Sequence, residues 1–189
     1  MYYVFNTLMH LSFLKKYCFI DQFNSDHLKN LNKNITLIWR SKYKQDDLKL
    51  IKKLAFFCKT NQRRLFLSNN VKLAIKLKLD GVYISAHNRN YRFNNYKFKK
   101  NFKIIGSAHN LIELNIKKQQ NIREIFISPI FKYKNRSPIG IHKCKYFFKD
   151  DSYKIIALGG VSKNNINLLK LTKFSGFAGI NFFKKKGPK

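Results

Sequence analysis

The sequence is short of acidic side chains: 9 Asp and Glu stand against 39 Lys and Arg in 189 residues, a formal charge of +30. It also has only three prolines and no low-complexity linker, so no boundary between domains is indicated. We therefore expect one domain over residues 1–189. The three cysteines, Cys18, Cys58 and Cys144, lack metal-binding spacing and are odd in number. They are predicted to be buried thiols in a reducing compartment.

The sequence also lacks a long uncharged apolar run. His10, Lys15 and Lys16 interrupt the first twenty residues, and no small-residue cleavage site follows. Neither a secretory signal nor a membrane span is predicted, so we expect a cytoplasmic protein with no membrane partner. Disorder as the main state is excluded, because 44% hydrophobic and 15% aromatic residues supply a core for a chain of this length.

The positive charge has two interpretations. Lys, Asn, Ile and Phe are abundant together while Gly, Ala, Pro and Arg are scarce, which is what AT-rich codon usage produces in any protein. Alternatively, the charge attracts phosphates or nucleic acid. The basic residues are spread along the whole chain, and the densest basic and aromatic run, residues 89–103, matches no nucleic-acid motif. A nucleic-acid partner is therefore not expected, although the charge alone leaves it open.

Short apolar runs recur about every twenty residues and indicate buried strands. Eight such runs lie at residues 17–21, 35–39, 64–67, 81–84, 103–106, 124–128, 155–158 and 176–180. Strands that are apolar throughout and separated by helices imply a parallel sheet covered on both faces or closed into a barrel. Eight units favour an α/β fold of the (β/α)8 TIM-barrel type. An open doubly wound sheet of six or seven strands is the alternative.

Helical spacing of apolar residues fills four of the intervals between these strands. Helices are predicted over residues 46–59 and 70–78, from Asn110 onward as an N-cap, and from Ser162 onward. The helical signal is weakest at residues 24–34 and 88–102. Because 189 residues is slightly below the usual lower limit of about 200 for this barrel, some helices must be very short.

In such a barrel the active site is built just after the carboxyl end of each strand. Gly159 and Gly160 end the seventh strand ahead of a predicted helix, where backbone amides could approach a phosphate; a tight turn would explain the pair equally well. Arg40 and Lys42 alternate at the end of the second strand and could grip phosphate oxygens. The other polar residues at strand ends are Ser41, Ser68, Asn69, Asn70, Ser85, His87, Asn88, Ser107, His109, Tyr133, Lys134, Arg136 and Ser162.

Four segments in order, LFLSNNVKLAIKLKLDGVYIS, IIGSAHNLIEL, IFISPIFKYKNRSPIGI and IIALGGVSKNNINLLKLTKFSGFAGI, resemble the thiamine phosphate synthase and thiazole tautomerase superfamily. The resemblance covers about residues 35–180 and implies a (β/α)8 fold. For the synthase branch it implies thiamine biosynthesis: a hydroxymethylpyrimidine diphosphate condenses with a thiazole phosphate and pyrophosphate leaves with Mg²⁺ assistance. The implied partners are these phosphorylated small molecules.

Carried over position by position, the resemblance implies diphosphate binding by Arg40, Lys42 and Ser68. Its Gln at the second strand end is replaced by Ile38. It implies substrate binding by Ser107 and Tyr133 and a catalytic role for Lys134. It implies phosphate binding by Gly159, Gly160 and Asn181, the last in place of a Ser.

The acidic Mg²⁺ positions of the family fall on Asn69 and Asn88, so both expected carboxylates are amides here. Amide oxygens are poorer Mg²⁺ ligands than carboxylates, which makes the cofactor doubtful. Asp21 is the one acidic residue expected near the barrel mouth. The alternatives are a metal-independent thiazole tautomerase, with His109 as the acid–base group and His87 as a second candidate, and a catalytically degenerate barrel that binds phosphate ligands or nucleic acid. The structural alternative for His109 is a residue at a helix start that hydrogen-bonds to the local backbone.

Overall fold

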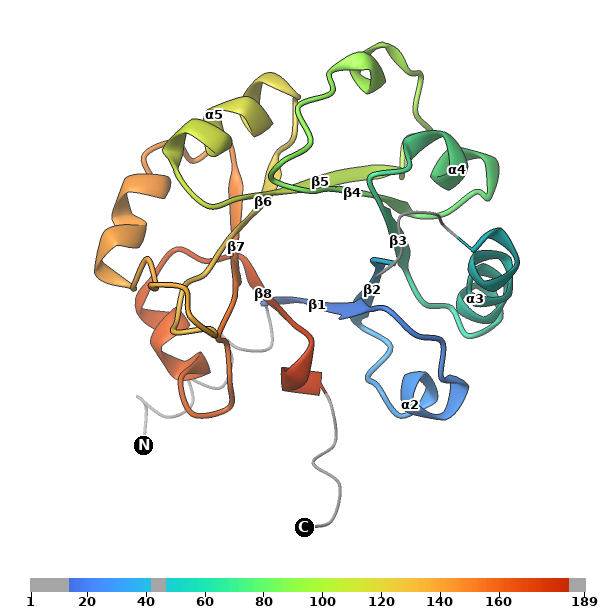
Figure 1. Ribbon diagram of the computed structural model, residues 1–189, viewed down its shortest axis with the longest axis horizontal. Coiled ribbons are helices and arrows are strands. Elements are labelled where there is room, and N and C mark those ends of the chain that lie inside the picture. Colours follow the sequence, from blue (N-terminus) through green and yellow to red (C-terminus); the bar gives the residue numbers. More distant parts are fainter. Residues whose placement is uncertain (1–13, 42–46, 184–189) are drawn as a thin grey trace.

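The computed structural model describes residues 14–41 and 47–183 and shows a closed barrel of eight parallel strands (Figure 1). Each strand pairs with its neighbours in chain order, and β8 closes the ring by pairing with β1. The (β/α)8 fold is therefore confirmed and the open-sheet alternative is wrong. The strands are β1 (Lys15–Ile20), β2 (Ile35–Trp39), β3 (Leu65–Ser68), β4 (Gly81–Ile84), β5 (Lys103–Ala108), β6 (Glu124–Ile127), β7 (Lys154–Leu158) and β8 (Gly176–Gly179).

The inside of the barrel is filled largely by aromatic rings. Phe126 lies near the centre of this cluster, with ring centroids 5.0 Å from Tyr17, 6.0 Å from Phe19 and 5.7 Å from Tyr83. The other face of the strands packs Leu, Ile and Val against the helices. The strands are largely buried on both faces and mostly apolar, with charged residues at the first positions of β1, β5, β6 and β7, which is why they could be identified from the sequence.

Three α-helices begin where the sequence predicts. These are α3 (Leu48–Thr60), α4 (Val71–Lys76) and α5 (Leu111–Gln119). In each, the residue before the helix is an N-cap whose side chain accepts a backbone N–H: Asp47 from Leu50, Asn70 from Leu73 and Asn110 from Glu113. Side-chain caps satisfy N–H groups that a helix leaves unpaired at its first turn.

The remaining connections are short, as expected where the helical signal is weak. Residues 24–34 contain only α2 (Ser25–Lys29), and residues 88–102 contain only the 3₁₀ turn η1 (Arg92–Asn95). Two further 3₁₀ segments, η2 (His142–Phe147) and η4 (Asn181–Phe183), follow β6 and β8.

The α-helix predicted from Ser162 is wrong. A 3₁₀ helix, η3 (Ile166–Leu171), occupies this interval instead. The Asn165 side chain accepts the Ser162 N–H at 2.8 Å and donates to the Gly160 carbonyl at 2.8 Å. These side-chain bonds hold the chain in a turn ahead of η3.

The three cysteines are buried, as the sequence predicts. Cys18, Cys58 and Cys144 are buried thiols, and burial raises the pKa of Cys58 to about 12 and that of Cys144 to about 11. Among the described residues, no helix is long and apolar enough to cross a membrane.

Candidate functional site

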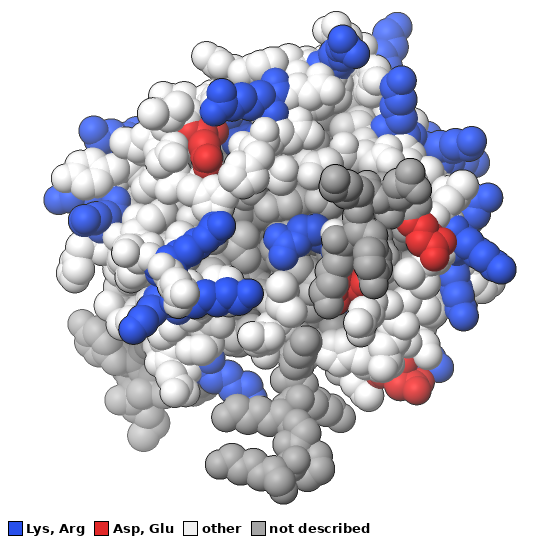
Figure 2. All heavy atoms as spheres, viewed as in Figure 1, with Lys and Arg blue, Asp and Glu red and all other residues white. Residues whose placement is uncertain are grey.

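A cavity of about 600 Å³ opens at the carboxyl ends of the strands, where a barrel of this type carries its active site. Its described lining includes three cations, Arg40, Lys134 and Arg136, and two imidazoles, His87 and His109. No Asp or Glu is among the lining residues that the structure describes. Figure 2 shows Lys and Arg side chains over the viewed face, several near its centre, and few acidic ones. A hollow of this composition favours an anionic ligand.

Arg40 follows β2 and is fixed to the neighbouring strand. Its backbone N–H donates to the carbonyl of Ile20 at 2.9 Å, and its guanidinium lies 5.2 Å from the Phe19 ring centroid. The aromatic ring supports the cation without neutralising it. Arg40 therefore lies at the cavity as expected, whereas Lys42 lies outside the described residues.

Tyr133, Lys134 and Arg136 come from a tight turn in the loop after β6. Tyr133 and Arg136 form an antiparallel bridge, and the Arg136 N–H donates to the Tyr133 carbonyl at 3.2 Å. Lys134, at the tip, has φ +52°, and its ammonium lies 5.7 Å from the Tyr133 ring centroid. The turn thus presents two cations and an aromatic ring to the cavity, as the strand-end argument predicts.

Gly159 and Gly160 also line the cavity, and their backbone explains why both are glycine. Their φ values are +84° and +70°, and a Cβ on Gly160 would lie 2.6 Å from the Lys132 carbonyl oxygen. A Cβ on Gly159 would lie 2.8 Å from Pro129 Cα. The pair therefore lets the loops after β6 and β7 pack together, and the tight-turn explanation holds. Phosphate binding at the pair, and at the cavity-lining Asn181, stays a prediction.

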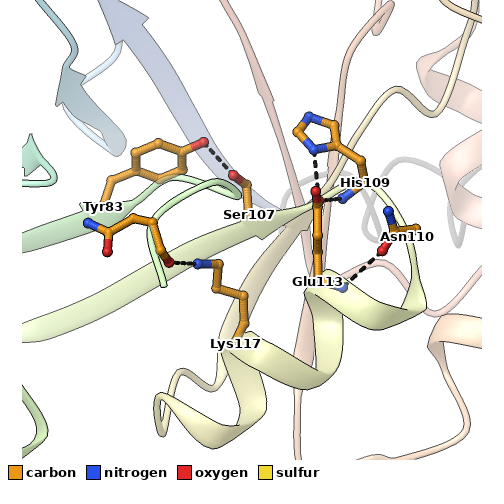
Figure 3. A network of polar contacts seen from close by, with 7 residues as sticks. Tyr83, Ser107, His109, Asn110, Glu113 and Lys117 are labelled. Carbon is orange, nitrogen blue, oxygen red and sulfur yellow. Dashed lines mark hydrogen bonds and ion pairs between the residues drawn. The ribbon is translucent and has the colours of Figure 1, made fainter. Parts of the chain in front are cut away.

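Ser107 lies on β5 at the floor of the cavity and is 3% exposed. The Tyr83 hydroxyl donates to Ser107 Oγ at 2.8 Å (Figure 3). Burial raises the pKa of Tyr83, so it stays a neutral donor. Because Tyr83 supplies a proton to this bond, the Ser107 hydroxyl can donate its own to a ligand.

His109 follows β5 and is held by Glu113 on α5 (Figure 3). Glu113 Oε2 lies 2.9 Å from His109 Nδ1 and accepts the His109 backbone N–H at 2.7 Å. Burial by itself raises the pKa of Glu113, but the contacts with His109 lower it by a larger amount. The pKa of Glu113 is therefore below its ordinary value. The carboxylate fixes the ring with Nδ1 engaged, which leaves Nε2 for other chemistry. His87 stacks on His109 at a centroid distance of 5.8 Å.

Ser68, Asn69 and Asn88 are not among the cavity-lining residues. Ser68 is the last residue of β3. The two Asn side chains bond to each other, with Asn88 Nδ2 donating to Asn69 Oδ1 at 3.3 Å. Asp21, expected near the mouth, follows β1 and is likewise not among the described lining residues.

Lys117 on α5 was missed by the sequence analysis. Its side chain is fully buried, and Nζ donates to the Asn88 carbonyl at 2.7 Å and to Gln120 Oε1 at 2.9 Å. Burial lowers the pKa of Lys117 to about 8. The available signal was its position: Lys117 lies three residues after the buried Leu114, on the stripe of α5 that faces the barrel.

The residues at the family's metal positions do not fit Mg²⁺. Asn69 Oδ1 already accepts two N–H groups, from Asn88 Nδ2 and from Ser85 at 2.9 Å, and Asn88 Oδ1 accepts the Asn90 N–H at 2.9 Å. In the described part of the chain, no group of three or more His, Cys, Asp or Glu residues could hold a metal ion. Mg²⁺ is usually held in proteins by one or two carboxylates, which this arrangement does not offer.

Comparison with known proteins identifies the family of this chain. A family model described as thiamine monophosphate synthase matches residues 28–183. This chain belongs to that family. The resemblance of its four segments to the superfamily is thereby confirmed.

Individual relatives in the thiamine monophosphate synthase family are distant. The thiamine-phosphate synthase of Prochlorococcus marinus (strain AS9601) is 28% identical over 138 residues, covering 71% of this chain and 39% of the relative. That of Staphylococcus carnosus (strain TM300) is 28% identical over 143 residues, covering 72% of this chain and 66% of the relative. The chain thus spans only part of the length of these curated relatives.

A solved structure, the thiamine phosphate pyrophosphorylase from Pyrococcus furiosus, superposes with a TM-score of 0.69 at 15% identity. The match covers 92% of this chain and 88% of that chain. At this identity the likeness supports the fold alone. Family membership rests on the sequence match, and the barrel rests on both.

Proposed function

We propose that this chain catalyses the thiamine phosphate synthase reaction, the condensation of a hydroxymethylpyrimidine diphosphate with a thiazole phosphate. The observation that carries the proposal is the cavity at the strand ends, which Arg40, Lys134 and Arg136 line without a described carboxylate. Both substrates and the pyrophosphate product are anions. A family member with a cation-lined cavity at this end of the barrel is suited to bind them.

In the proposed reaction the bond between the pyrimidine methylene carbon and the diphosphate oxygen breaks. Its electron pair leaves on pyrophosphate, and the lone pair of the thiazole nitrogen forms the new C–N bond. Negative charge grows on the leaving oxygen as positive charge grows on the methylene. Arg40 and Lys134 supply fixed positive charge to the leaving group, which lowers the barrier because they need no reorganisation during the reaction.

The second contribution is orientation of the two substrates. Ser107 at the floor can donate a hydrogen bond to the pyrimidine, and the Tyr133 ring offers an apolar face beside it. The backbone at Gly159 and Gly160, together with Asn181, also borders the cavity, and there the thiazole phosphate would bind. Holding two reactants in line replaces a bimolecular encounter and contributes to the rate.

The direct test is thiamine phosphate formation from both substrates by the purified, folded chain, with and without MgCl₂. Arg40→Ala should lower kcat/KM by about 100-fold, because removing a charge-assisted contact to the leaving group costs about 2.7 kcal/mol. The matched control is Arg123→Ala, since Arg123 is exposed and directly precedes β6 at the opposite end of the barrel. No product under either condition, or equal rates for the two variants, would refute the synthase proposal.

The His109–Glu113 pair favours a second candidate, a metal-independent thiazole tautomerase. A carboxylate on Nδ1 orients the imidazole and supports proton transfer at Nε2, while the cations would bind the phosphate of the thiazole carboxylate substrate. His109→Gln should then abolish the interconversion of the thiazole tautomers, which NMR can monitor. If wild type forms no thiamine phosphate and His109→Gln leaves tautomer exchange unchanged, both candidates fail.

A further inference from the structure

The amide pair at the β3 and β4 strand ends is complementary in a way that two carboxylates could not be. Asn88 Nδ2 donates to Asn69 Oδ1 at 3.3 Å. Two carboxylates this close repel unless a proton or a cation lies between them, whereas one amide can donate while the other accepts. The pair is therefore held together without an ion.

The oxygens of the pair are engaged in loop structure. Asn69 Oδ1 also accepts the Ser85 N–H at 2.9 Å, which occupies both of its lone pairs. Asn88 Oδ1 accepts the Asn90 N–H at 2.9 Å. The Asn69 backbone is left-handed, with φ +59°, and its N–H donates to the Tyr83 carbonyl at 2.7 Å. A cation at this position would have to displace bonds that shape the loop after β4.

Two buried side chains at the end of α5 brace the loop after β4, because both donate hydrogen bonds to its backbone carbonyls. Lys117 Nζ donates to the Asn88 carbonyl at 2.7 Å, and Gln120 Nε2 donates to the Asn88 and Asn90 carbonyls at 3.0 and 2.9 Å. Both side chains are almost fully inaccessible to solvent, at 0% and 1% exposure. Buried, hydrogen-bonded polar networks of this kind favour one conformation.

We infer that this network, from Lys117 and Gln120 through Asn88 to Asn69, replaces the family's metal site, so that the cavity binds a diphosphate without Mg²⁺. The charge that a metal ion would supply comes from the cavity cations Arg40, Lys134 and Arg136. The inference rests on the proposed function, because it assumes that the cavity takes a diphosphate. At the positions where the family resemblance implies a bound ion, this chain instead has side chains whose hydrogen bonds hold the loop after β4.

The first experiment titrates the full chain with inorganic pyrophosphate by calorimetry, in EDTA and in MgCl₂. Binding should occur in EDTA, with equal or weaker affinity in MgCl₂, because Mg²⁺ competes for the diphosphate in solution. Binding that appears only with MgCl₂, or is at least about tenfold tighter there, overturns the inference and leaves the proposed function standing. Absence of binding in both buffers overturns the proposed function and the inference with it.

A double variant, Asn69→Asp with Asn88→Asp, tests whether the pair occupies the metal position. Two neighbouring carboxylates should weaken pyrophosphate binding in EDTA by about tenfold or more, and MgCl₂ should restore it. Circular dichroism confirms that the double variant is folded. A folded double variant that responds to MgCl₂ no more than wild type contradicts the assignment.

The brace is tested by amide hydrogen exchange at Asn90, whose N–H is bonded to Asn88 Oδ1. Lys117→Met keeps the side-chain length and removes the ammonium, so exchange at Asn90 should rise at least about tenfold while EDTA has no effect on the wild-type rate. The control is Lys118→Met, because Lys118 bonds Asp150 and faces the Tyr153 ring. Unchanged exchange at Asn90 in folded Lys117→Met contradicts the proposed brace.

Discussion

The two ends of the barrel treat charge in opposite ways. At the amino ends of the strands, Glu124 of β6 pairs with Lys15 of β1 and accepts a hydrogen bond from the Tyr17 hydroxyl at 2.7 Å. Burial by itself raises the pKa of Glu124, but Lys15 and Tyr17 together lower it by a larger amount. The pKa of Glu124 is therefore below its ordinary value. Each charged or hydroxyl partner named in this cluster is another side chain of the same protein.

At the carboxyl ends, the described cavity lining has three cations and no carboxylate. Glu113 on α5 lies beside this lining and contacts His109. The two ends therefore use ionic side chains differently. The paired charges at the amino ends stabilise the barrel, whereas the cavity cations at the carboxyl ends are available to bind an anion. Charge left unbalanced in a folded protein costs stability, so its retention points to a ligand.

The largest expected effect concerns the shape of the mouth. Gly160→Ala should destabilise the protein by about 3 kcal/mol, because the new Cβ would lie 2.6 Å from the Lys132 carbonyl oxygen at a φ of +70°. Chemical denaturation measures the change. Gly140→Ala is the control, since Gly140 also has a positive φ, +77°, but nothing lies within 4 Å of its Cβ position. Equal losses in the two variants would mean that φ alone matters, without the close approach of the loops.

The second-largest effect on stability is expected at the amino ends of the strands. Glu124→Gln is expected to lower the free energy of unfolding by about 2 kcal/mol, because Lys15 loses its counter-charge in a partly buried site. Pyrophosphate binding should not change. Asp151→Asn provides the control, since the Asp151 pair with Lys173 is highly exposed and should contribute nothing measurable. A loss of ligand affinity in Glu124→Gln would show that the two ends are coupled.

Much of this fold could be predicted from the sequence because its causes are local. Each strand contains an apolar run that is buried, and Asp47, Asn70 and Asn110 are N-caps with side chains suited to that role. The failure at Ser162 concerns the type of helix: the chain does turn there, with the Ile166 N–H donating to the Ser162 carbonyl at 3.0 Å, but a 3₁₀ helix follows.

The site could be predicted only in part. Strand ends identified Arg40, Ser107, His109 and the turn containing Lys134, because topology alone brings carboxyl ends of parallel strands together. Lys117 could not be singled out in the same way, since the sequence does not show that its partner is a loop carbonyl 29 residues away. The Glu124 cluster, which joins residues 109 positions apart, was missed for the same reason.

At the mouth, removing a cation should affect binding and leave folding intact. Lys134→Ala and Arg136→Ala are each expected to weaken pyrophosphate binding about tenfold, or about 1.4 kcal/mol, with no loss of stability, because each removes positive charge from a chain of +30. Calorimetry and denaturation measure the two quantities. Arg123→Ala should leave affinity unchanged. A stability loss as large as that of Glu124→Gln would erase the distinction between the two ends.

The smallest expected effect concerns Glu113, the carboxylate that orients His109. Since its folded-state pKa is lowered, its contribution is present above about pH 4.3, the ordinary value for Glu, and is lost as pH falls through the folded pKa. Glu113→Gln should therefore be less stable than wild type by about 0.5 kcal/mol at pH 6, a value reduced by partial exposure, and equal to it near pH 3. Denaturation midpoints at both pH values measure this difference, with the exposed Asp26→Asn as control. A gap that persists at pH 3 would mean that Glu113 acts through packing and not through its charge on His109, and the mouth would then have no ionised carboxylate in a positioning role.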